Sequence, residues 1–180
     1  VNPTGPRACY DEGKRSAETL VFDFKRKFNA KIKVLRIFNT YGPYMAKNDG
    51  RVISNFILNS INNKELKIYG NGKNTRSFCY VDDLIDMILK VSKIKKNIST
   101  PVNIGNDYEI TIKELANIII KLNNSNSKII YAKSLLNEPK IRRPDLKLIN
   151  KLIKIKNKTK LIDGLFKTTQ YFRENYSYFY

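Results

Sequence analysis

Tyr10 and Lys14 are the first residues along the chain whose types and spacing could do acid–base chemistry. In a helix, side chains four positions apart lie on one face, so the phenol and the ammonium group would be neighbours. A free tyrosine has a pKa of about 10, and a neighbouring ammonium group favours the phenolate and lowers that pKa. The pair could therefore take a proton from a substrate hydroxyl. Tyr and Lys also fall four apart by chance in many helices.

Arg76 stands between Thr75 and Ser77, and its type suits the binding of phosphate. A guanidinium group is planar and can grip two phosphate oxygens at once. The alternative is an ordinary surface arginine. Two further arginines, at positions 142 and 143, precede a Pro and an Asp that can open a helix, and here the alternative is a pair of exposed side chains.

A short strand is expected over residues 31–38, and Asn39 and Thr40 follow it directly. Open α/β folds bind their ligands at the carboxyl edge of the sheet, so polar groups at this strand end are candidates for ligand binding. The alternative is a plain turn closed by Gly42 and Pro43.

Helices and strands are expected to alternate along the chain, which predicts an α/β fold with parallel pairing. The helices are expected over residues 10–28, 52–62, 81–93, 111–123, 145–153 and 159–175. Further strands are expected over 101–105 and 128–132, with two more around a turn at 70–74. Thr111 and Glu114 have the spacing of a capping box.

Composition excludes several classes of function. The net charge is +18, from 34 Lys plus Arg against 16 Asp plus Glu, but the lysines are scattered and no zinc-finger or basic-zipper spacing appears, so no nucleic-acid partner is expected. Without histidine, and with only Cys9 and Cys79, neither a metal site nor a His-based triad is available. No apolar run approaches the roughly 20 residues of a membrane span, and two thiols favour a reducing compartment. We therefore expect a cytoplasmic protein without a membrane partner.

Four segments closely resemble UDP-glucuronate decarboxylases, which are extended short-chain dehydrogenases of the NAD-dependent epimerase/dehydratase family. The most distinctive is NPTGPRACYDEGKRSAET at residues 2–19, which contains a Tyr-x-x-x-Lys motif. The others are RIFNTYGPYMAKNDGRVISNFI at 36–57, LKIYGNGKNTRSFCYVDDL at 66–84 and EPKIRRPDL at 138–146. The resemblance covers residues 2–145, with departures from the family pattern at Phe24, Tyr44 and Ala46.

The resemblance implies roles for individual residues. Tyr10 is implied as the base, Lys14 as its partner on the cofactor ribose, and Arg142, or Arg143 in its place, as the arginine that closes over the substrate. The implied cofactor contacts are Tyr10, Lys14, Phe38, Thr40 and Arg51, and the implied substrate contacts are Asn39, Arg51, Tyr69, Arg76 and Arg142.

The implied fold is the carboxy-terminal portion of a Rossmann-type enzyme with its substrate-binding subdomain. Residues 1–50 would end the Rossmann core and 51–180 would mainly bind the nucleotide sugar, within one incomplete domain. The chain has no Gly-rich phosphate cradle and begins with Val1, so we expect a fragment that does not turn over substrate alone.

The implied reaction converts UDP-glucuronate to UDP-xylose through a C4-keto intermediate with recycled NAD, in a homodimer. Two alternatives stay open. A nucleotide-sugar epimerase or 4,6-dehydratase would use most of the same residues, and a basic binding protein of another class would keep the fold without catalysis.

Overall fold

The structure, a computed structural model, describes residues 2–6, 8–47, 49–134, 139, 141–155 and 158–176. These residues form six helices and nine strands, with two or three strands between successive helices as far as α5. The helices are α1 (Ala8–Phe28), α2 (Val52–Ile61), α3 (Val81–Ser92), α4 (Ile112–Leu122), α5 (Lys147–Leu152) and α6 (Leu161–Tyr176). The strands are β1 (Leu35–Ile37), β2 (Thr40–Tyr41), β3 (Leu66–Tyr69), β4 (Thr75–Ser77), β5 (Cys79–Tyr80), β6 (Val102–Ile104), β7 (Glu109–Thr111), β8 (Ile129–Ala132) and β9 (Ile141–Arg142).

Most strand pairs are parallel, which confirms the predicted α/β class. β1 pairs with β6, β2 with β5, β3 with β8 and β4 with β9 in parallel. The antiparallel pair is β4 with β7, so the order of the largest sheet is β7-β4-β9. Each parallel partner comes from a distant part of the chain, as the helices between them require.

The two strands expected around the turn at 70–74 are present as β3 and β4, but they do not pair with each other. β3 instead pairs with β8, and β4 pairs with β7 and β9. The intervening Gly70 and Gly72 have φ of +76° and +74°, which lets the chain leave one sheet and enter the next. A turn signal in the sequence therefore marked a change of sheet.

Local signals set the helix ends. Glu114 N–H donates to Thr111 Oγ1 at 3.1 Å, and Thr111 N–H donates to Glu114 Oε2 at 2.9 Å, which confirms the capping box that begins α4. The hydrogen bond from the Thr111 backbone is the largest cause of the lowered pKa of Glu114. The apolar positions of α4 then face one side and are buried.

Two apolar cores hold the elements together. The first lies between α2, α4 and α6 and the strands β3 and β7, and its fully buried side chains include Tyr41, Ile57, Leu66, Leu115, Ile119, Leu165 and Phe172. The second lies between α3, α5 and β6, and includes Met87, Val91, Val102, Ile104 and Ile149.

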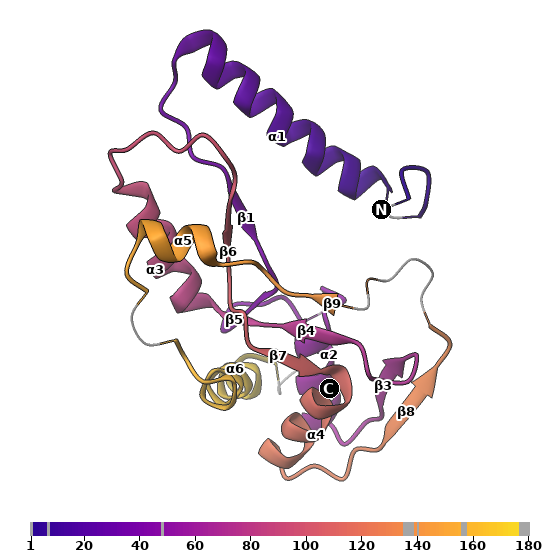
Figure 1. The fold of residues 1–180 in the computed structure, drawn as a ribbon. Helices are drawn as coiled ribbons and strands as arrows, with labels where there is room; N and C mark the ends of the chain where they lie inside the picture. Colours follow the sequence, from indigo (N-terminus) through magenta and orange to yellow (C-terminus); the bar gives the residue numbers. More distant parts are fainter. Residues whose placement is uncertain are drawn as a thin grey trace.

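Helix α1 extends away from both cores as an arm (Figure 1), and none of its described residues is buried. Glu18 holds α1 to β1 by accepting two hydrogen bonds from Arg36, at 2.7 and 2.6 Å. Hydrogen bonding to Arg36 is the largest cause of the lowered pKa of Glu18. Lys25 Nζ also donates to the carbonyls of Ile32 and Ile98. A few polar contacts therefore orient a helix whose apolar side is exposed. Among the described residues, no helix is long and apolar enough to cross a membrane.

Candidate functional site

Tyr10 and Lys14 lie next to each other in the first turns of α1, as their spacing predicted. Lys14 Nζ is 5.6 Å from the centre of the Tyr10 ring, and 60% of Tyr10 is exposed. An exposed phenol beside an ammonium group can approach a substrate hydroxyl directly. Because α1 is regular here, the geometry of the pair follows from the i, i+4 spacing alone.

The segment after β1 connects the two cores and places Asn39 beside β4. Phe38 N–H donates to Ile104 O at 3.1 Å, and Cys79 N–H donates to Asn39 O at 2.9 Å. The side-chain amide of Asn39 donates to Ser77 O at 3.4 Å, and Thr40 Oγ1 donates to Phe38 O at 2.9 Å. Hydrogen bonds to β6 on one side and to β4 and β5 on the other thus hold the segment after β1, which the sequence predicted to bind ligand.

Phe38 also lies against Gly105, which closes the end of β6. A Cβ built on Gly105 would lie 3.1 Å from Phe38 Cβ, and the backbone φ of Gly105 is +154°. The close approach requires glycine here, so the position of Phe38 depends on a residue that sequence reasoning had not singled out.

Arg76 and Arg142 meet in the β7-β4-β9 sheet. They are register partners in the parallel β4–β9 pair, and Ser77 Oγ donates to Arg142 O at 3.3 Å. Arg76 is only 6% exposed and donates from Nη1 to Thr75 O at 2.7 Å. The structure therefore brings Asn39, Arg76 and Arg142 together around β4, which joins three of the predicted substrate residues.

Arg51 and Tyr69 lie on other elements. Arg51 precedes α2, and its Nε is 3.6 Å from Asp49 Oδ2. Asp49 also accepts bonds from Arg51 N–H at 3.0 Å and Ser54 Oγ at 2.5 Å, so it orders the start of α2. Tyr69 ends β3 with Lys67 Nζ 5.4 Å from its ring centre. Sequence reasoning missed Asp49, although its place two residues before Arg51 was a signal.

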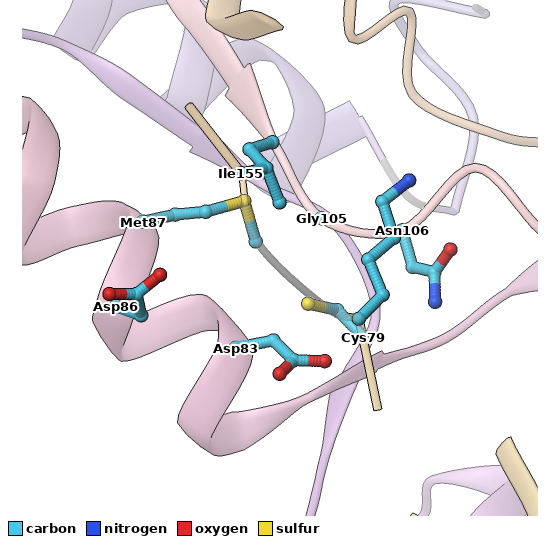
Figure 2. Close-up of a pocket in the computed structure, with 8 residues that line it drawn as sticks. Cys79, Asp83, Asp86, Met87, Gly105, Asn106 and Ile155 are labelled. Carbon is cyan, nitrogen blue, oxygen red and sulfur yellow. The ribbon is translucent and has the colours of Figure 1, made fainter. Parts of the chain in front are cut away.

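A small cavity beside β5 is structural. Figure 2 shows Asp83 and Met87 on the α3 side of it, and Cys79 of β5 together with Gly105 and Asn106 on the other side. It holds about 10 Å³, room for one water molecule at most. Asp83 accepts bonds from Thr159 N–H at 2.8 Å and Oγ1 at 2.9 Å. Asp83 therefore joins α3 to the segment that leads into α6.

The two thiols are expected to differ sharply in reactivity. Burial, and next the charge of Asp83, raises the pKa of Cys79 to about 12, whereas Cys9 is exposed. At pH 8 a disulfide reagent should label one thiol per native chain and the second only after denaturation, as counted by absorbance. A Cys9→Ser variant should lose the fast label, and two fast thiols in the native chain would contradict the structure.

The same thiol makes stability depend on pH at the alkaline end. In the unfolded chain a cysteine has a pKa of about 8.5, whereas in the fold the Cys79 pKa is raised, so the fold favours the neutral thiol. Its contribution to stability is complete below pH 8 and declines as the pH rises above the unfolded pKa.

Several known proteins are similar to this chain in sequence. The sequence profile of the "NAD dependent epimerase/dehydratase family" matches residues 1–105. UDP-glucuronic acid decarboxylase 1 from Danio rerio is 46% identical over 172 residues, and its counterpart from Xenopus tropicalis is 43% identical over 174. These alignments cover 96% and 97% of this chain, which spans 41% of the length of either relative.

A solved structure has the same fold. UDP-glucuronic acid 4-epimerase from Bacillus cereus, in complex with UDP-glucuronic acid and NAD, superposes with a TM-score of 0.84 at 29% identity. The match covers 91% of this chain and 52% of that one. The extended short-chain dehydrogenase fold that the motifs implied is confirmed.

Proposed function

The chain belongs to the NAD-dependent epimerase/dehydratase family, and from that membership we propose that it forms the nucleotide-sugar-binding part of a UDP-glucuronate decarboxylase. Residues 1–50 would finish the dinucleotide-binding core, and 51–180 would mainly bind the nucleotide sugar. Since β6 pairs with β1, residues 102–104 would also belong to the dinucleotide-binding core.

One observation carries the proposal: Arg76 and Arg142 are register partners, with Asn39 bonded to the same strand. Two guanidinium groups and an amide in one place suit a diphosphate, because charge-assisted hydrogen bonds to phosphate are strong and directional. The identity of 43–46% to decarboxylases over nearly the whole chain supports UDP-glucuronate as the substrate. Tyr69, exposed at the end of β3, is proposed to contact the uracil.

The residues at the start of α1 and the end of β1 fit the nicotinamide end of NAD. Tyr10 and Lys14 are adjacent and exposed, so a bound ribose and a sugar hydroxyl could both reach this pair of side chains. Phe38, Thr40 and Arg51 would complete the cofactor contacts. NAD, when bound, supplies the reversible oxidation of the sugar C4 hydroxyl.

The chain's own residues would move protons around that oxidation. Tyr10 takes the proton of the C4 hydroxyl, and Lys14 stabilises the phenolate and binds the ribose. The resulting C4 ketone lies β to the carboxylate, so the electrons left by carbon dioxide are delocalised into an enolate. Arg142, or a water molecule that it orients, supplies the proton to C5. When the C4 ketone is reduced again by the two electrons that its oxidation had released to the cofactor, Tyr10 would return its proton to the C4 oxygen, which gives UDP-xylose.

A homodimer is proposed to form through α1. Its apolar side chains Leu20, Phe24 and Phe28 are all exposed, and the rings of Phe24 and Phe28 are 4.5 Å apart. Burying such side chains against a second subunit or a further part of the protein would remove a large apolar area from water.

The test is UDP binding by the purified chain. UDP at about a hundred times its Kd should stabilise the chain by about 2.7 kcal/mol, seen as a rise in Tm. The Arg142→Ala variant should lose this rise, whereas the matched variant Arg26→Ala, on the surface of α1, should keep it. A chain that gives no shift with UDP but binds RNA with a steep salt dependence would contradict the proposal and support a basic binding protein.

A further inference from the structure

The β7-β4-β9 sheet, whose strands are labelled in Figure 1, carries different side chains on its two faces. Successive side chains of a strand point to opposite faces, and register partners share a face. Arg76 and Arg142 are partners and therefore share one face. Thr75 and Ser77 flank Arg76 and point to the other face. Glu109 is the partner of Ser77, so it belongs to that second face.

Arg143 follows Arg142 and falls on the second face, where Glu109 binds it. Arg143 Nη1 is 3.1 Å from Glu109 Oε2, and Thr75 Oγ1 donates to Glu109 Oε1 at 2.7 Å. Both carboxylate oxygens of Glu109 thus accept a hydrogen bond, one from Thr75 on β4 and one from Arg143 just after β9. The side chain of Glu109 is 28% exposed and that of Arg143 is 56% exposed.

The register of β9 needs such an anchor because the strand is only two residues long. A shift of one residue in a strand moves every side chain to the opposite face. In β9 that shift would place Arg143 beside Arg76 and turn Arg142 away. The short ladder between β4 and β9 gives little resistance to the shift, since only two residues are paired.

We propose that Glu109 is a positioning residue that binds Arg143 and so keeps Arg142 beside Arg76, on the face of the sheet that we propose binds the nucleotide sugar. This inference rests on the proposed function and assigns different roles to the tandem arginines: Arg143 anchors the strand and Arg142 faces the nucleotide sugar. An exposed ion pair contributes little to stability, so its effect here is on geometry.

The test measures the UDP affinity of the full 180-residue chain by calorimetry. Glu109→Gln keeps the shape of the side chain but removes its charge. It should weaken UDP binding about three- to tenfold, although residue 109 is not proposed to contact UDP. Arg143→Ala should weaken binding by a similar factor, and the double variant should be no weaker than either single variant. Arg143→Lys keeps a cation for Glu109 and should bind UDP nearly as the unmodified chain does.

The control is Asp86→Asn, which removes the exposed Asp86–Lys90 ion pair of α3 and should leave the UDP affinity unchanged. The inference is overturned if Glu109→Gln binds UDP like the unmodified chain, or if the effects of Glu109→Gln and Arg143→Ala multiply in the double variant. If the unmodified chain itself does not bind UDP, the proposed function fails and the inference fails with it. A purely structural role would lower Tm in every variant without the non-additive loss of affinity.

Discussion

Replacing Tyr10 by phenylalanine is expected to lower turnover of UDP-glucuronate at least about a hundredfold and to leave UDP affinity unchanged. The substitution removes only the phenolic oxygen, which we propose takes the C4 proton. The ring itself and the neighbouring Lys14 stay in place, because both are held by the helix backbone of α1. The nucleotide contacts that we propose lie around β4, on other elements, so we expect UDP binding not to depend on this oxygen.

The measurement needs a protein that contains a complete active site. A hybrid in which this chain replaces the matching part of the Danio rerio decarboxylase provides one, since the two are 46% identical over 172 residues. UDP-xylose is measured by chromatography, first for the hybrid with the unmodified chain and then for the variant. Tyr108→Phe removes a phenol that is equally exposed, at 63%, and serves as the matched control.

Unchanged turnover by the Tyr10→Phe hybrid would mean that another group takes the proton. A loss of UDP affinity equal to the loss of turnover would mean instead that Tyr10 binds substrate and does no chemistry, because a base acts only in the transition state. A lowered rate constant with unchanged UDP affinity separates these cases.

Elements whose signals lie within a few residues were predictable from the sequence. The long apolar period of α1, the branched residues of β1 and the capping box of α4 each act over one or two turns of chain. The Tyr10–Lys14 pair belongs to the same class, since a helix fixes its geometry. The helices α1 and α4 begin and end within two residues of their predicted bounds, whereas β1 spans only Leu35–Ile37 of the strand predicted over 31–38.

The strands β2, β7 and β9 were not predicted, and each is only two or three residues long. Such strands exist only through partners far along the chain, as when Thr40 pairs with Cys79, and no periodicity can appear in two residues. The same cause hid Glu109. Its importance comes from contacts with Thr75 and Arg143, each 34 residues away.

Gly164→Ala is expected to destabilise the chain although it places a better helix former inside α6. In an exposed helix the exchange stabilises by about 1 kcal/mol, because alanine loses less backbone entropy on folding. At Gly164 a Cβ would overlap Tyr41 Oη and would lie 2.9 Å from both Tyr41 Cζ and Tyr80 Cδ2. Tyr41 is 2% exposed and cannot move into solvent.

The clash also breaks a hydrogen bond, since Tyr41 Oη donates to Leu161 O at 3.3 Å. Overpacking a closed core costs about 1–3 kcal/mol, so the clash outweighs the gain in helix propensity. We expect a net loss of about 1–2 kcal/mol in the free energy of unfolding, measured by urea titration.

Two further variants test the cause. Gly13→Ala is the matched control: a Cβ there meets nothing within 4 Å, and α1 should gain helix stability. Adding Tyr41→Phe to Gly164→Ala removes the nearest atom, so the double variant should lose less than the sum of the two single losses. If the two losses simply add, Tyr41 is not the obstacle. If Gly164→Ala stabilises as Gly13→Ala does, α6 does not pack on Tyr41 as closely as the structure has it.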